Sequence, residues 1–242
     1  MAKAIRVHET GGPEVLRWED VTLEAPGPGE VRVRHTAVGL NFIDVYFRKG
    51  LYKAPGLPFT PGQEAAGVVE ALGPGVTGLA VGDRVTYATG PLGSYAEARN
   101  ALADKLVKLP AGVDDRVAAA IMLKGMTAQY LLFQTTQVKA GDVILFHAAA
   151  GGVGSLACPW AKHLGATVIG TVGSEEKAAL ARAAGCDHVI VAKNGDFSRL
   201  AAEVKALTGG RGVRVVYDSV GKDSFLASLD CLAPRGLMVL FG

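Results

Sequence analysis

Small residues gather at one point in the chain and restrict what it can fold into. The stretch HAAAGGVG occupies residues 147–154, between an apolar run and an amphipathic one. Glycines in such a row weaken helices and strands, so they indicate a backbone that a ligand must approach closely. Residues 149–154 also fit the spacing A-x-G-x-x-G, which is typical of dinucleotide-binding turns between a strand and a helix.

The residues of this turn have distinct expected roles. Gly151 lets the backbone approach a pyrophosphate, and Gly154 lets the following helix pack closely on the strand. Gly152 and Val153 lie between them, where the helix N-terminus offers N–H groups and a positive dipole end to phosphates. Small-residue turns also occur for packing alone, but the flanking strand and helix favour a nucleotide site.

The second half of the chain alternates strands with helices. A helix is predicted over residues 117–138, with a break at Gly125. This alternation predicts a parallel sheet with crossover helices, which is a doubly wound α/β domain. The predicted strands are residues 143–147, 167–171, 188–191, 213–218 and 237–241.

The first half has a different rhythm, with short strands broken by Gly and Pro. Evenly spaced short strands indicate a β-barrel-type domain. The sequence therefore predicts two domains, residues 1–122 and residues 123–242, with the dinucleotide-binding turn in the second. The predicted strands of the first domain are residues 31–35, 66–70, 83–87 and 94–98.

Composition excludes several function classes. The chain has 242 residues and a net charge of +2, so it carries neither a basic stripe for nucleic acid nor a polybasic membrane patch. Every apolar stretch is cut by Gly, Pro or a charge before it is long enough to span a bilayer. The N-terminus lacks a signal-peptide core, and three widely spaced cysteines do not make a disulfide framework. These features favour a cytoplasmic protein.

The end of the second predicted strand bears on which dinucleotide binds. An NAD site usually has an acidic residue there for the ribose 2′-OH, but this chain has Gly173 and Ser174, with Lys177 soon after. A 2′-phosphate would accept a hydrogen bond from Ser174 and pair with Lys177, which favours NADPH. The alternative is that Ser174 is only a helix N-cap and Lys177 a solvated lysine.

Further motifs carry a resemblance to a known family. The stretches NFIDVYFRKGLY, PGQEAAG, LKGMTAQYLL and RVVYDSVG begin at residues 41, 61, 123 and 214. With HAAAGGVG, they resemble the medium-chain dehydrogenase/reductase superfamily, and most of all its zinc-independent NADPH quinone oxidoreductases similar to zeta-crystallin. The resemblance covers the whole chain. It implies a GroES-like domain followed by a Rossmann domain, and a homodimer.

The residues at two positions argue against a metal. In zinc-dependent members of the superfamily, zinc ligands match Asn41 and Gln63, and neither side chain is a good zinc ligand. Without a Lewis acid, an unactivated ketone is a poor hydride acceptor, whereas a quinone needs less help. The expected substrate is therefore a quinone, with a conjugated enal or enone as the alternative.

The resemblance also implies site residues. Asn41, Tyr46 and Tyr52 are expected at the catalytic site, although the tyrosines also fit ordinary packing. Asn41 also fits a helix N-cap, and Asp218 fits a helix cap. Relatives often have a tyrosine at Ala192 that helps to bind the 2′-phosphate, which weakens the expectation of strict NADPH preference. The expected cofactor contacts outside the turn are Phe42, Ile43, Asp44, Tyr46, Lys124, Thr127, Tyr130, Gly173, Ser174, Lys177, Tyr217, Asp218 and Ser219.

The resemblance raises two further expectations. The chain ends at LMVLFG, whereas relatives continue with another strand and a return segment, so we expect an incomplete second domain with an exposed sheet edge. Zeta-crystallin-like proteins also include lens components and RNA binders, which gives an alternative function as a nucleotide-dependent binding protein. The nearly neutral charge weighs against RNA.

Overall fold

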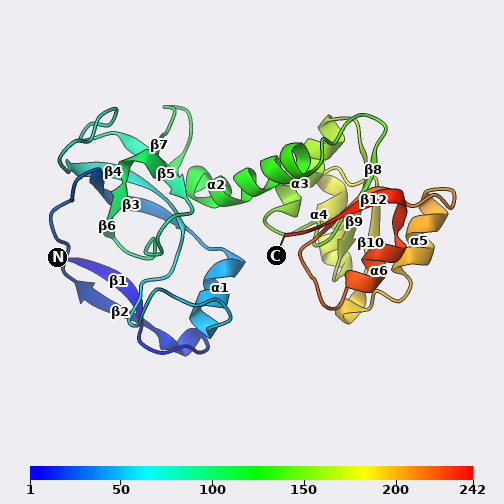
Figure 1. Cartoon of the computed structure of the whole chain (residues 1–242), viewed down its shortest axis with the longest axis horizontal. Helices are drawn as coiled ribbons and strands as arrows, with labels where there is room; N and C mark the ends of the chain where they lie inside the picture. Colours follow the sequence, from blue (N-terminus) through cyan, green and yellow to red (C-terminus); the bar gives the residue numbers. More distant parts are fainter. Residues whose placement is uncertain (242) are drawn as a thin grey trace. The chain divides into compact units, whose positions relative to one another are not determined.

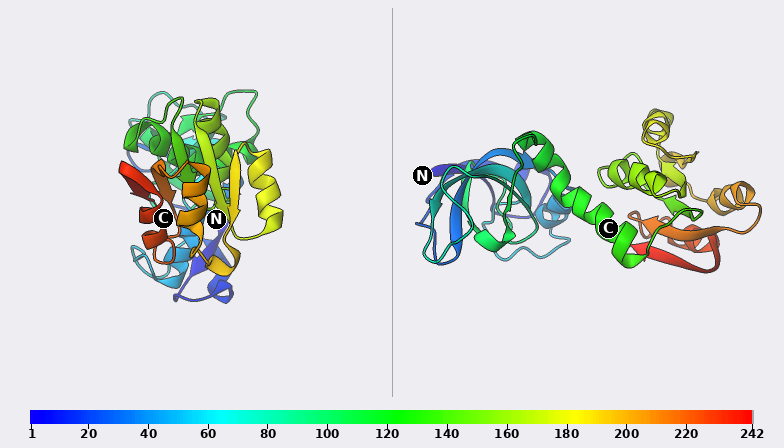
Figure 2. Two further views of the ribbon diagram at one scale, coloured as in Figure 1. Left: turned by 90° about the vertical axis from the view of Figure 1, so that its right-hand side faces the viewer. Right: turned by 90° about the horizontal axis from the view of Figure 1, so that it is seen from above.

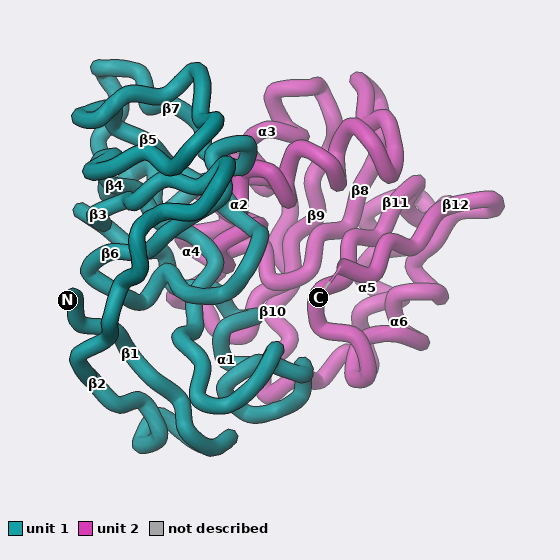
Figure 3. Tube along the Cα trace, turned by 60° about the vertical axis from the view of Figure 1, so that its left-hand side comes forward, with its two compact units in different colours: residues 1–123 teal, residues 124–242 magenta. Residues whose placement is uncertain are grey.

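The computed structural model describes residues 1–241 (Figure 1). The chain divides into two compact units, Met1–Leu123 and Lys124–Gly242 (Figure 3). Helix α2, Asp115–Tyr130, begins in the first unit and ends in the second. Short 3-10 turns occur at Pro13–Val15, Ala103–Lys105 and Lys193–Gly195, and a π-helical turn at Leu131–Thr135.

Unit 1 is built from antiparallel strands. Its main sheet has the order β6-β3-β4-β5-β7, and β1 pairs with β2 in a separate hairpin. One helix, α1 at Phe42–Lys49, follows β3. The core of the sheet is made of small apolar side chains, among them the fully buried Val31, Val33 and Val85. The strands are β1 Ala2–Val7, β2 Leu16–Val21, β3 Glu30–Gly39, β4 Glu64–Leu72, β5 Arg84–Ala88, β6 Ala98–Leu102 and β7 Val107–Lys108.

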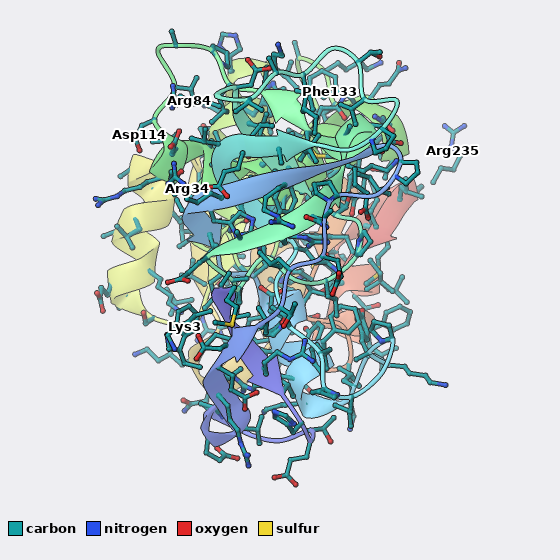
Figure 4. All side chains as sticks on the ribbon, turned by 90° about the vertical axis from the view of Figure 1, so that its left-hand side faces the viewer. Lys3, Arg34, Arg84, Asp114, Phe133 and Arg235 are labelled. Atoms are coloured by element: carbon teal, nitrogen blue, oxygen red, sulfur yellow. The ribbon has the colours of Figure 1, made fainter. Side chains whose placement is uncertain are left out.

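Lys3, Arg34 and Arg84, which Figure 4 labels, are cations of unit 1 that form ion pairs. Lys3 lies 3.2 Å from Asp20, and the Arg34 Nε atom lies 2.9 Å from Glu70. Arg84 bonds to Asp115 at the start of α2. Exposed pairs of this kind contribute little stability, but they disperse the positive charge.

Unit 2 is a parallel sheet covered on both faces. The strand order is β10-β9-β8-β11-β12, with every pairing parallel. On β8, Ile144 and Phe146 pack on the face covered by α3 and α4, whereas Leu145 packs on the face covered by α5 (Figure 2). The strands are β8 Val143–Phe146, β9 Thr167–Val172, β10 His188–Val191, β11 Val213–Asp218 and β12 Leu232–Leu240, and the helices are α3 Gly154–His163, α4 Glu175–Ala183, α5 Leu200–Leu207 and α6 Phe225–Asp230.

The predicted fold class is therefore confirmed, with local corrections. The predicted helix break at Gly125 is wrong, because α2 runs through that residue. One interior glycine costs a helix only about 1 kcal/mol, and the surrounding Ala, Leu and Met offset it. The predicted strand at residues 94–98 is also wrong in position, since β6 begins at Ala98.

The last strand lies at one edge of the parallel sheet. β12 pairs with β11 alone among the described residues, and its Leu237 and Leu240 side chains are about half exposed. It begins at Leu232, five residues before the predicted start, and a register shift in its pairing with β11 lies between Val213 and Val215.

Candidate functional site

The turn between β8 and α3, residues 148–154, forms what we call the elbow. Ala148 adopts a left-handed conformation with φ 50°, which turns the chain sharply after the strand. A Cβ atom on Gly154 would lie 2.5 Å from the carbonyl oxygen of Ala149 and 2.6 Å from that of Ala148. Only glycine fits there, because the obstacles are backbone atoms. Helix α3 consequently begins in direct contact with the end of β8.

The elbow presents unused hydrogen-bond donors. Its Gly151 N–H donates to the Ala148 carbonyl at 2.8 Å. The next three N–H groups, those of Gly152, Val153 and Gly154, bond to no acceptor within residues 1–241. Three unpaired amides at the positive end of a helix fit a bound anion such as a diphosphate.

Lys124 lies over this elbow. A Cβ atom on Gly152 would lie 3.0 Å from the Cδ atom and 3.1 Å from the Cε atom of Lys124, so the lysine stem packs against the exposed glycine. Its expected place near the cofactor stays a prediction. Thr127 and Tyr130 follow at three-residue spacing along α2, and both are partly buried. Tyr130 packs against the core of unit 2, and burial raises the pKa of its hydroxyl.

The end of β9 carries the residues predicted to select the dinucleotide. Ser174 is the N-cap of α4, and its hydroxyl accepts the Lys177 N–H at 3.3 Å. A Cβ atom on Gly173 would meet nothing within 4 Å, so the space beside the strand end is open. The N-cap role of Ser174 is thus present in the structure, and its role toward a 2′-phosphate stays a prediction.

The end of β11 carries a buried tyrosine. Tyr217 is fully buried, with its hydroxyl 2.5 Å from Thr136 Oγ1 and donating to the Leu131 carbonyl at 3.0 Å. Its side chain lies in the core of unit 2, so its expected contact with the cofactor stays a prediction that only the main chain at this strand end could fulfil. Ser219, two residues later, is partly exposed.

We expect Tyr217→Phe to lower stability without changing affinity for NADPH. The substitution removes a hydroxyl with two buried partners, so the free energy of unfolding should fall by about 1–2 kcal/mol. Urea unfolding measures the loss, and fluorescence titration measures the affinity. Thr208→Val is the control, because it removes a buried hydroxyl elsewhere in unit 2 and should also lose stability without changing the affinity. A weaker NADPH affinity in Tyr217→Phe alone would support the predicted cofactor contact.

Asp218 is also fully buried, and its carboxylate is committed to the protein itself. Its Oδ1 atom accepts the N–H groups of Val220 and Gly221 at 2.8 and 3.0 Å. Both oxygens accept from Ser224, and Oδ2 accepts from Ser228. Burial alone would raise the pKa of Asp218, but these donors outweigh it and hold the pKa below its ordinary value. Asp218 therefore shapes the loop after β11, and its expected place beside the cofactor stays a prediction.

In unit 1, a cluster of buried polar side chains lies at the start of α1. Asn41 is the N-cap, and its side-chain amide donates to Glu64 Oε2 at 2.7 Å. The other oxygen of Glu64 accepts the Leu123 N–H at 2.7 Å. Asp44 Oδ2 accepts the Asn41 N–H and the Tyr95 hydroxyl, both at 2.9 Å. Sequence reasoning singled out Asn41 and Asp44 but missed Glu64, although it lies within the PGQEAAG motif.

Aromatic rings form a surface beside this group. The ring centroids of Phe42 and Tyr46 are 5.4 Å apart, and those of Tyr46 and Tyr52 are 5.3 Å apart. Phe42 is 72% exposed and Tyr52 41% exposed, so the rings can receive a flat aromatic molecule. Ile43 lies next to Phe42 and is partly buried. The predicted catalytic tyrosines are thus brought together on one surface of unit 1.

Within residues 1–241, no three His, Cys, Asp or Glu side chains are grouped so that they could hold a metal ion. No helix in that range is long and apolar enough to cross a membrane.

Known proteins match the chain along its length. Residues 27–143 match the model of the alcohol dehydrogenase GroES-like domain, and residues 152–242 match that of the zinc-binding dehydrogenases. The chain is 58% identical to a quinone oxidoreductase of Pseudomonas aeruginosa and 52% identical to a 2-haloacrylate reductase of a Burkholderia species, covering all of this chain and 74% and 73% of those proteins.

A solved structure gives the same result. The quinone oxidoreductase of Escherichia coli in complex with NADPH matches with a TM-score of 0.96 and 51% identity, over all of this chain and 73% of that one. The chain thus spans about three quarters of the length of these relatives. It belongs to the quinone oxidoreductase family of the medium-chain dehydrogenase/reductase superfamily, as its motifs predict.

Proposed function

We propose that the protein is an NADPH-dependent quinone reductase. The observation that carries the proposal is its 51% identity and TM-score of 0.96 to a quinone oxidoreductase solved with NADPH. The elbow supports it, because three unpaired N–H groups and an overlying lysine suit the diphosphate of a dinucleotide. When bound, NADPH supplies the hydride from its nicotinamide ring.

The two predicted domains would bind different ligands, the cofactor in one and the quinone in the other. Residues 123–242 would hold the cofactor, with the N–H groups of Gly152, Val153 and Gly154 on the diphosphate. Ser174 and Lys177 would hold the 2′-phosphate, the serine by a hydrogen bond and the lysine by its charge. The absence of a carboxylate at Gly173 and Ser174 supports this choice over NADH.

Residues 1–122 would hold the quinone. Phe42, Tyr46 and Tyr52 would stack against its ring, since aromatic pairs favour offset and edge arrangements. The amide of Asn41 keeps one orientation, because Glu64 accepts one of its two hydrogens. The second hydrogen is left for a substrate carbonyl, where it would stabilise charge developing on oxygen. After hydride transfer, the one proton that completes the hydroquinone comes from solvent.

Spectrophotometry of the purified protein tests the proposal. We expect para-benzoquinone to be reduced with NADPH faster than with NADH, because of the charge on Lys177. Lys177→Ala should raise the KM for NADPH about ten-fold and leave the KM for NADH nearly unchanged. The matched control is Lys205→Ala, an exposed lysine on α5 of unit 2. If NADPH binds but no quinone is reduced, the proposal is wrong.

A second candidate is the reduction of a double bond conjugated to a carbonyl or carboxylate. The observation in its favour is the 52% identity to a 2-haloacrylate reductase. Such a reaction adds a hydride to one alkene carbon and a proton to the other. Comparing kcat/KM for a 2-haloacrylate, an enone and para-benzoquinone under the same conditions separates the two activities.

We infer further that the protein acts in the cytoplasm as a homodimer, which the family resemblance supports. Sedimentation equilibrium tests the dimer, and a mass equal to that of one chain at micromolar concentration would exclude it.

A further inference from the structure

A buried histidine stands directly before the elbow and has no part in the proposed function. His147 follows the last residue of β8, and none of its side chain is exposed. Its Nδ1 atom lies 2.8 Å from Thr171 Oγ1, and its Nε2 atom lies 2.9 Å from Ser228 Oγ. Phe197 packs edge-on against the ring, with centroids 5.3 Å apart. Both ring nitrogens are therefore used inside the protein.

The directions of these hydrogen bonds follow from Asp218, the residue at which the hydrogen-bonded network ends. The ionised carboxylate of Asp218 only accepts hydrogen bonds, so Ser228 must donate its single hydroxyl hydrogen to Oδ2, at 2.9 Å. Ser228 must then accept from His147, which places a hydrogen on Nε2. In a neutral ring Nδ1 is the acceptor, and it receives the hydroxyl hydrogen of Thr171.

A neutral ring agrees with its surroundings. Burial lowers the pKa of His147, and this outweighs the nearby Asp218 carboxylate, which acts in the opposite direction. The Asp218 charge is stabilised by its own donors from Val220, Gly221 and Ser224, and Asp218 Oδ2 also lies 3.8 Å from the Nε2 atom of His147.

The chain of donors connects three neighbouring strands. Thr171 lies on β9, His147 follows β8, and Asp218 ends β11, which are adjacent in the sheet order. Main-chain hydrogen bonds join the same segments. The His147 N–H donates to the Tyr217 carbonyl, and the Ala149 N–H donates to the Thr171 carbonyl, both at 3.0 Å. The first residues of the elbow are thus held from both sides.

We propose that His147 is a positioning residue for the cofactor: neutral and protonated on Nε2, it transmits one fixed run of hydrogen bonds, Thr171 to His147 to Ser228 to Asp218, and so holds the elbow in the shape that receives the diphosphate. This rests on the proposed function, in which the elbow binds NADPH. The network also reaches two other parts of the predicted cofactor site. Asp218 shapes the loop after β11, and Thr171 lies two residues before Gly173. The network therefore fixes the elbow, this loop and the end of β9 relative to one another.

The first test measures NADPH affinity by fluorescence titration. Thr171→Val removes one buried hydroxyl of the network, and Thr208→Val removes a matched buried hydroxyl elsewhere in unit 2, which bonds to Val204 and Gly212. We expect both variants to lose similar stability, but only Thr171→Val to raise the Kd for NADPH, by about five-fold. His147→Phe should raise it by about ten-fold or more.

Three further readouts separate positioning from a purely structural role. His147→Gln keeps a donor near the place of Nε2 and should recover part of the affinity lost in His147→Phe. At saturating NADPH, kcat should stay within about two-fold of wild type, with the effect confined to the KM for NADPH. Nitrogen-detected NMR of labelled histidine should find the Nε2–H form, unchanged between neutral and mildly acidic pH.

The outcomes distinguish the two proposals. If the wild-type protein does not bind NADPH, the proposed function fails and the role of His147 fails with it. If the wild type binds NADPH and His147→Phe binds it equally well while folded, only the positioning role is wrong. An Nδ1–H or doubly protonated His147 would contradict the donor directions whatever the affinities are.

Discussion

Gly154→Ala is expected to abolish measurable NADPH binding. The added methyl group would sit 2.5 and 2.6 Å from two backbone carbonyl oxygens, which no side-chain rotation can relieve. Helix α3 must then move away from β8, and the three N–H groups of the elbow lose their common direction. We expect the Kd for NADPH to rise by about a hundred-fold or more, and stability to fall by about 2–4 kcal/mol. Fluorescence titration and urea unfolding measure the two effects.

The control is chosen from the glycines themselves. A Cβ atom on Gly112 meets nothing within 4 Å, and this residue lies in unit 1, outside the elbow. Gly112→Ala should bind NADPH as the wild type does. A Gly154→Ala protein with wild-type affinity would mean that the contact between α3 and β8 does not set the geometry of the anion site.

Acidification is expected to destabilise unit 1 well before its carboxylates are protonated. His35 donates from Nδ1 to the Ala96 carbonyl at 2.6 Å and accepts at Nε2 from the Tyr87 hydroxyl, at 2.9 Å. Burial, helped by the charge of Arg99 and opposed by the Ala96 bond, lowers the pKa of His35 to about 4. In the unfolded chain a histidine has a pKa of about 6.5.

The sign of the effect follows from proton uptake. Between about pH 6.5 and pH 4 the unfolded state binds a proton that the folded state does not, so the free energy of unfolding falls as the pH falls. His35 alone should remove about 2–3 kcal/mol between pH 7.5 and 4.5. Carboxyl groups with lowered pKa, such as Asp115, act with the same sign but mainly below about pH 4.

Tryptophan fluorescence can measure this fall in the free energy of unfolding for unit 1 alone. Trp18 lies in unit 1 and Trp160 in unit 2, so urea unfolding in a Trp160→Phe background reports unit 1. His35→Gln in the same background should show a smaller fall between pH 7.5 and 4.5, by the amount assigned to His35. Equal falls with and without His35 would exclude the buried neutral histidine as the cause. Taking the difference between variants also removes the contribution of His147.

The sequence predicts the strands of unit 2 better than those of unit 1. β10 and β11 agree with the predicted residues 188–191 and 213–218, because each is a short apolar run bounded by turn residues. β1 and β2 were not predicted, since their charged residues alternate only weakly with apolar ones, although the two strands are neighbours in the sequence. The helix through Gly125 was misjudged because neighbouring residues outweigh one glycine.

The candidate site divides in the same way. The close packing predicted for Gly154 depends on local chain geometry and is found in the structure. The orientation of Tyr217 was not predictable, because β11 is buried on both faces and therefore lacks the alternation that would distinguish them. The role of His147 depends on Thr171 and Ser228, which lie 24 and 81 residues away in the sequence, so no local pattern indicates it.

The free cysteines Cys158, Cys186 and Cys231 all belong to unit 2, and each is buried. Cys158 lies on α3, Cys186 precedes β10, and Cys231 lies between α6 and β12. A thiol-specific alkylating reagent can therefore react only when unit 2 opens, and opening of unit 1 gives no signal in such an experiment. Alkylation rates at the three positions therefore measure local opening without any introduced label. They distinguish opening around α3 from opening around α6.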